Sequence, residues 1–173
     1  MKHQIKTKTP IITLLLVSLM ALLLSFSGCS SAPDMGYARF SSADWQFSID
    51  YPASWQQQVI TNSKTPQVIF SGHVGGSSAS IAVVKYNKSY QTLFDQFNQS
   101  GHTAVLEFQD KVENNITYST FTQTIGVVFI RNYLCKFGED LSILLATSID
   151  DSVSQYDKDT FNSYVVHMVG SLQ

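Results

Sequence analysis

Residues 127–149 read VVFIRNYLCKFGEDLSILLATSI, and this stretch carries the clearest structural signal in the chain. Two largely apolar runs, 127–137 and 141–149, flank the short polar segment Gly138-Glu139-Asp140. This pattern predicts two antiparallel strands joined by a tight turn. Because apolar residues occupy both alternating faces of each run, we expect the hairpin to lie inside a sheet that is covered on both sides.

Further strands are expected on the N-terminal side of this hairpin. From Trp45 to Tyr51 apolar and polar residues alternate, which is typical of a half-buried strand, and Pro52 ends the pattern because proline cannot continue a ladder. The other predicted strands are 68–70, 79–86, 104–112 and 116–125, with a loop at 73–78 and a turn at 113–115.

Two helices complete the prediction. Ser89 can cap a helix over 90–100, and a second helix is expected to start at Asp157 or Asp159 and to end at Gly170. Each carries a single apolar stripe. Seven or so strands and two such helices predict an α+β fold, with a mostly antiparallel sheet and helices on both faces. We therefore expect a three-layer α/β/α sandwich.

The N-terminus has the organisation of a signal peptide. Lys2, Lys6 and Lys8 precede an apolar run over residues 11–24, with no acidic residue among them. This run is shorter than the roughly 20 residues that a membrane-spanning helix needs. We therefore interpret residues 1–28 as a signal peptide and consider a permanent transmembrane helix the weaker interpretation.

The end of this segment carries a lipidation motif. Residues 24–29, LSFSGC, resemble the bacterial lipobox, although Phe26 stands where the motif usually has leucine. The resemblance implies that Cys29 is diacylated and becomes the new N-terminus, and that Ser30 directs the protein to the outer membrane if the source has two membranes. An ordinary secretory signal with an incidental cysteine is the alternative.

The residues after Cys29 suggest a spacer. Residues 29–43 are mostly small and polar and include Pro33 and Gly36, so we interpret them as a lipidated N-terminus and a flexible tether before a globular domain over 44–173. Two or three acyl chains give stable membrane binding. The expected location is therefore the extracytoplasmic side of the cell membrane or the outer membrane.

Charge and cysteine content narrow the possible functions. After residue 28 the chain keeps eight basic and thirteen acidic residues, a net charge of −5, which argues against binding to nucleic acid. With Cys29 lipidated, Cys135 has no partner for an intramolecular disulfide. Its apolar neighbours suggest a buried, unreactive thiol.

Both ends of the predicted domain resemble a known family. Residues 44–55, DWQFSIDYPASW, look like the opening strand of the PsbP-like proteins, and residues 161–172, FNSYVVHMVGSL, resemble their closing helix. The resemblance covers about residues 40–173 and implies the Mog1/PsbP-like fold of non-catalytic proteins that bind other proteins. None of the docking or metal-binding residues of the photosystem members matches a position here. We interpret Pro52 and Trp55 as structural.

The histidines and acidic residues show no metal-site spacing. His73, His102 and His167 are well separated in the sequence. His73, in the glycine loop, and His102, beside Gly101, could still come together in the fold. We interpret the acidic residues near the last helix as stabilising its N-terminus rather than binding calcium. These residues are Asp150, Asp151, Asp157 and Asp159.

Catalytic and phosphate-binding motifs are also missing from the sequence. Gly72 to Ser78 lacks the lysine and the following Ser/Thr of a phosphate loop, and no serine lies in a nucleophile motif. We therefore expect no enzymatic activity, no catalytic residue, no bound metal and no cofactor.

The leading functional hypothesis is a binding or adaptor module for an envelope protein or another ligand. Exposed aromatic and loop residues are the expected contacts, because such residues often anchor partners. The candidates are Tyr37, Phe40, His73 and Tyr156, with the rest of the loop at 73–78.

Two other functions remain open. The first is a small-ligand carrier with a cleft lined by Tyr86, Tyr90 and Tyr118. The second is a hydrolase or metal-dependent enzyme whose residues converge only in space.

Overall fold

The computed structural model describes residues 36–61, 65–99, 103–104, 110–125 and 128–173. All of them belong to one compact unit that extends from Met35 to Gln173. The predicted signal peptide, Cys29 and His102 lie outside the described residues. Within the described part, no helix has the length and apolarity that crossing a membrane requires.

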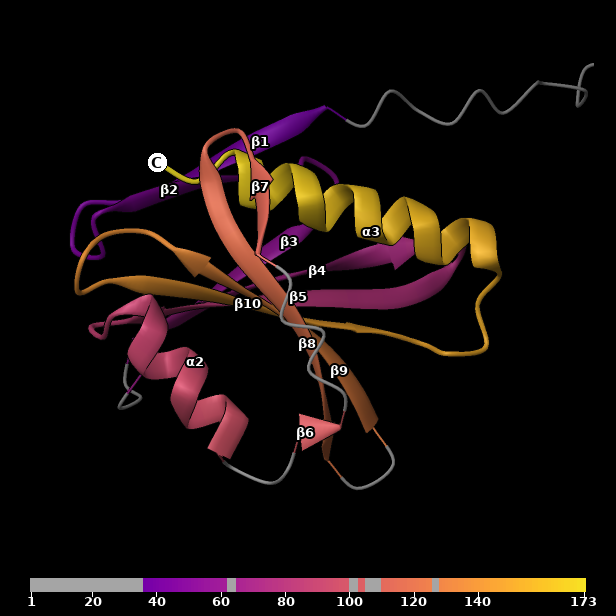
Figure 1. The fold of residues 1–173 in the computed structure, drawn as a ribbon. Coiled ribbons are helices and arrows are strands. Elements are labelled where there is room, and N and C mark those ends of the chain that lie inside the picture. The colour runs from indigo at the N-terminus through magenta and orange to yellow at the C-terminus, as the bar shows by residue number, and fades with distance from the viewer. Residues whose placement is uncertain (1–35, 62–64, 100–102, 105–109, 126–127) are drawn as a thin grey trace, which may run out of the picture. The chain divides into compact units, whose positions relative to one another are not determined.

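The predicted hairpin forms the middle of a large antiparallel sheet (Figure 1). Strands β9 (Val128–Lys136) and β10 (Ser142–Ile149) pair antiparallel, as the sequence predicts, and the structure places Leu144 opposite Leu134. The strand order is β3-β4-β5-β10-β9-β8-β6, and β7 also pairs with β8. The other bounds are β3 Gln56–Ile60, β4 Gln67–Val74, β5 Ser77–Tyr86, β6 Thr103–Ala104, β7 Lys111–Glu113 and β8 Ile116–Ile125.

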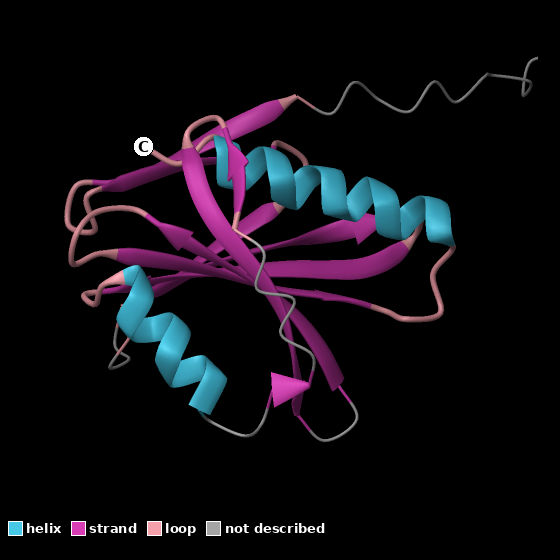
Figure 2. Cartoon of the chain, viewed as in Figure 1, coloured by secondary structure: helices cyan, strands magenta, loops and turns pink. Residues whose placement is uncertain are grey.

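Each face of this sheet has its own hydrophobic core, because successive side chains of a strand point to opposite faces. In β9, Tyr133 and Cys135 belong to one core, whereas Leu134 belongs to the other. Helix α3 (Gln155–Gly170) packs on the first core through Phe161 and its neighbours, and α2 (Tyr90–Gln99) packs on the second through Leu93. Figure 2 shows the two helices on opposite sides of the sheet, which confirms the predicted three layers.

A second, two-stranded sheet lies in the same layer as α3. It consists of β1 (Tyr37–Ser42) and β2 (Phe47–Pro52), which pair antiparallel with Phe40 opposite Ile49. Both of these side chains are buried in the core beneath α3. The predicted boundary at residue 44 is therefore wrong, because residues 37–42 form a strand of the globular domain rather than the end of a tether.

The turns follow from local conformational preferences. The β4–β5 connection is reduced to Gly75 and Gly76, whose φ angles of 57° and 85° lie in the left-handed region that glycine adopts without strain. Most of the loop predicted at 73–78 is thus strand. The predicted turn between β7 and β8 is confirmed, with Asn114 and Asn115 at φ 46° and 69°.

The helix starts were predicted with mixed success. Ser89 caps α2, since its Oγ accepts a hydrogen bond from the Thr92 N–H at 3.3 Å. The cap of α3 is Ser154, whose Oγ accepts from the Asp157 N–H at 3.2 Å, so the prediction of an aspartate cap is wrong. Asp157 instead lies in the first turn, where a carboxylate interacts favourably with the helix dipole.

Candidate functional site

The predicted contact residues do not form one surface. Tyr37 is 40% exposed and stacks on His167 near the end of α3, with ring centroids 3.7 Å apart, whereas Tyr156 is 75% exposed in the first turn of α3. His73 is exposed in β4. Phe40 is only 8% exposed and packs edge-on against Phe70, so the prediction of an exposed anchor is wrong for this residue.

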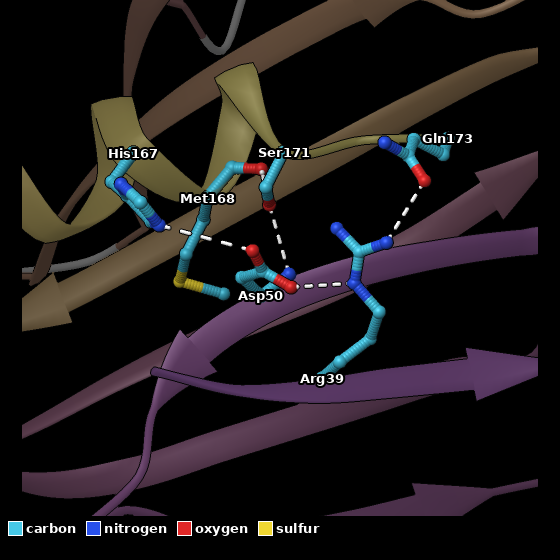
Figure 3. Close-up of polar contacts among 6 residues, drawn as sticks. All are labelled: Arg39, Asp50, His167, Met168, Ser171 and Gln173. Carbon is cyan, nitrogen blue, oxygen red and sulfur yellow. Dashed lines mark hydrogen bonds and ion pairs between the residues drawn. The ribbon is translucent and has the colours of Figure 1, made fainter. Parts of the chain in front are cut away.

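A serine, a histidine and an aspartate, the residue types of a hydrolase triad, lie close together around His167, but they lack the hydrogen bonds of a triad (Figure 3). Ser171 Oγ accepts a hydrogen bond from the Asp50 N–H and donates one to the Met168 carbonyl, both at 2.8 Å. His167 Nε2 lies 4.0 Å from Asp50 Oδ2. Because the Ser171 hydroxyl bonds to these backbone groups and not to the His167 imidazole, this group lacks the nucleophile–base pair of a triad.

The same group holds the C-terminal segment against β1 and β2. Arg39 Nε donates to Asp50 Oδ1 at 2.7 Å, and another nitrogen of Arg39 donates to Gln173 Oε1 at 2.8 Å. The backbones of Ser48 and Gln173 exchange two hydrogen bonds, of 2.7 and 3.1 Å. We call this arrangement the C-terminal clasp, and its role is structural.

The tyrosine cleft predicted for a small-ligand carrier does not form. Tyr118 is part of the core beneath α3, whereas Tyr86 and Tyr90 pack against the core beneath α2, on the other face of the sheet. The Tyr90 hydroxyl also bonds to Ser119 and donates to Asp110. The three side chains therefore cannot line one cavity.

The acidic residues near α3 make local contacts. Asp150 accepts a hydrogen bond from the Ser152 N–H at 2.8 Å, and this bond lowers the pKa of the Asp150 carboxyl. Asp157 accepts one from the Ser154 hydroxyl at 2.7 Å. In the described part of the chain, no three His, Cys, Asp or Glu side chains come close enough to hold a metal ion.

Cys135 is fully buried in β9, as its apolar neighbours predict. Burial raises the pKa of its thiol far above the usual value, because the thiolate would lose its hydration. Since the thiolate is the nucleophilic form, this side chain is not available for covalent chemistry at neutral pH.

A groove that sequence analysis missed runs between α3 and the adjoining sheet. It consists of two cavities, of about 370 and 390 Å³, that share Thr122, Arg131, Tyr133 and Asn162. We call it the α3 groove. The first cavity is also lined by Lys111, Tyr118, Thr120, Phe121 and Val166, and the second by Thr147, Ile149, Asp151, Gln155, Lys158, Asp159 and Phe161.

Strand pairing and helix periodicity build this groove. Thr122 lies opposite Arg131, and Thr120 lies opposite Tyr133, so β8 and β9 present alternate residues to α3. On α3, Asn162 and Val166 are one turn apart and therefore share a face. The Tyr133 hydroxyl donates to Asn162 Oδ1 at 2.7 Å, which ties the helix to the floor of the groove.

The groove is richer in positive charge than the rest of the domain. Lys111 and Arg131 line the first cavity, and Lys158 lines the second, together with Asp151 and Asp159. Within the described ranges, none of the three cations forms an ion pair shorter than 4.0 Å.

The buried tyrosines of the groove remain neutral at physiological pH. Burial raises the pKa of Tyr133, against an opposing effect of Arg131, and burial together with Glu113 raises the pKa of Tyr118. Neutral phenols can donate hydrogen bonds. The arrangement is therefore suited to hold a ligand by charge and hydrogen bonds.

Comparisons with known proteins found solved structures that are similar to this chain, including the following two. No family model and no curated protein matches the chain. A solution structure of cyanobacterial PsbP (CyanoP) from Synechocystis sp. PCC 6803 has a TM-score of 0.49 and 13% identity, over 86% of this chain and 98% of that one. A crystal structure from Bacteroides thetaiotaomicron VPI-5482 has a TM-score of 0.45 and 14% identity, over 80% of this chain.

The chain spans about half of the Bacteroides protein, 48% of its length. The α+β class follows from the strands and helices themselves. Membership of the PsbP-like family stays a prediction from residues 44–55 and 161–172.

Proposed function

We propose that the protein is a non-catalytic binding module, held on the extracytoplasmic side of a membrane by lipid on Cys29, and that it binds its partner or ligand at the α3 groove. The observation that carries the proposal is the pair of adjoining cavities between α3 and the sheet. Their volumes lie within the range of about 300–1,000 Å³ that is usual for small-molecule sites.

The chemistry of the groove favours binding over catalysis. Among the described residues, its lining consists of cations, tyrosines, threonines, two amides, two carboxylates and a few apolar side chains, without serine, cysteine or histidine. Such groups can orient a ligand and neutralise its charge through ion pairs and hydrogen bonds. The cavity volumes also favour the small-ligand carrier as a second candidate, at a different place from the predicted tyrosine cleft.

Charge reversal in the groove is expected to reduce capture of the partner. Arg131→Glu in the full chain should lower the yield of crosslinked partner from native membranes by about tenfold or more, since it replaces attraction by repulsion. The matched control is Lys136→Glu, an exposed cation of the same strand that lines neither cavity. Mass spectrometry after crosslinking measures the yield.

Both substitutions lie on the surface, so each should change the free energy of unfolding by only about 0.5 kcal/mol. An equal loss of capture in the two variants would count against the groove as the binding site. Unchanged capture in both variants would count against it as well.

A separate experiment tests the proposed lipid anchor on Cys29. Cys29→Ala should abolish incorporation of an alkyne fatty acid and leave the protein uncleaved or released from the membrane, because the acyl chains supply its stable membrane affinity. Cys135→Ala is the matched control and should keep the label. Label retained by the Cys29 variant would contradict the lipobox interpretation.

A further inference from the structure

We infer that the first cavity of the α3 groove binds an oxyanion group, a carboxylate or a phosphate, of a small organic ligand. This inference rests on the proposed function, which places binding at the groove, and it adds the chemical class of the ligand. Among the residues that the structure describes, the lining of this cavity includes two cations, Lys111 and Arg131, and no acidic residue. Arginine is well suited to such groups because its planar fork matches carboxylate and phosphate geometry.

Neutral donors complement the two cations. The Tyr133 hydroxyl donates to Asn162 Oδ1, which orients the amide and leaves Asn162 Nδ2 to donate to a ligand. Tyr118 is 5% exposed, lines the same cavity, and makes no hydrogen bond through its hydroxyl in the described part of the structure. Its neutral phenol can donate a hydrogen bond to a ligand acceptor in the cavity.

The charge of the surroundings distinguishes the two cavities. Three of the eight basic residues that follow the predicted cleavage site line the groove, although that part of the chain has a net charge of −5. In the second cavity Asp151 and Asp159 accompany Lys158. Burial and the negative charge of Glu113 raise the pKa of Tyr118, but Glu113 is not part of the lining of the first cavity. The anionic end of a ligand therefore belongs in the first cavity, and its remainder extends toward the second.

Isothermal titration calorimetry on the full chain in a neutral detergent tests this assignment, at constant ionic strength because exposed charges are screened by salt. The probes are inorganic phosphate and succinate, and the tighter of the two identifies the group that the cavity prefers. We expect saturable binding of at least one probe. Arg131→Gln and Lys111→Gln should each weaken it by about tenfold, or about 1.4 kcal/mol.

Lys136→Gln is the matched control and should change the affinity by less than about twofold, since Lys136 lies on the same strand outside the groove. Absence of saturable binding for both probes would overturn the inference, as would equal weakening in all three variants.

The two proposals fail separately. If neither probe binds but Arg131→Glu still lowers partner capture, the anion inference fails and the proposed function stands. If a probe binds as expected but groove variants leave capture unchanged, the anion site stands and the proposed binding of a partner at the groove fails.

Discussion

Replacement of Phe40 by alanine is expected to lower the free energy of unfolding by about 3–5 kcal/mol. The side chain is buried, and it contacts Trp45, Phe47 and Phe70 with ring centroids 5.8 to 6.0 Å apart. Its removal leaves a cavity between the β1–β2 layer and the large sheet. Because marginal domains have only about 5–15 kcal/mol of stability, much of the protein would unfold at moderate temperature.

Tyr37→Ala is the matched control, since Tyr37 lies in the same strand but is 40% exposed. We expect a loss of at most about 1 kcal/mol there. Urea unfolding of the full-length variants, followed by tryptophan fluorescence, measures both values. A small and equal loss of unfolding free energy in the two variants would contradict the burial of Phe40 and would favour the exposed contact role that the sequence suggested.

Replacement of Gly72 by alanine is expected to destabilise the protein by about 1–3 kcal/mol, as overpacking of a core usually does. A Cβ atom at position 72 would lie 2.4 Å from the nearest atom of the Trp55 indole. The indole cannot move freely, because it stacks on Phe161 and meets Tyr164 edge-on. Gly36→Ala is the control, with nothing within 4 Å of its Cβ, and should be nearly neutral.

A second substitution separates the steric clash from other effects. Trp55 Nε1 is buried without a hydrogen-bond partner among the described residues, so Trp55→Phe gives up volume but no hydrogen bond. The double variant should therefore be more stable than the sum of the two single losses predicts, by about 0.5–3 kcal/mol. Simple additivity, measured by thermal unfolding, would show that Gly72 is required for a reason other than contact with Trp55.

The parts of the fold that the sequence predicts are those where the local pattern and the buried surface agree. The β9–β10 hairpin and both helices were predicted because their apolar residues recur at the period of the element. Strand β3 was missed, since Gln56, Gln57 and Gln58 are exposed at the edge of the sheet and carry no apolar pattern. Strand β1 was missed because the residues around Phe40 show no regular alternation of apolar and polar side chains, although Phe40 itself is buried.

The α3 groove could not be predicted from residue spacing. Lys111 and Arg131 line one cavity only because β7 and β9 both pair with β8, which places distant residues on one face. One signal was present in the sequence. Arg131 interrupts the apolar run 127–137, and a charge inside a predicted central strand indicates a polar environment on one side of the sheet.

The C-terminal clasp can form only after residue 173 has been synthesised. Arg39 and Gln173 are 134 residues apart in sequence but joined by a hydrogen bond. Pairing between such distant segments forms slowly, since a long loop must close first. While the chain emerges from the ribosome, β1 and β2 therefore lack their hydrogen bonds to the C-terminal segment until Gln173 has been synthesised. The β1–β2 pair, although it is synthesised first, therefore gains its hydrogen bonds to the C-terminal segment only at the end of synthesis.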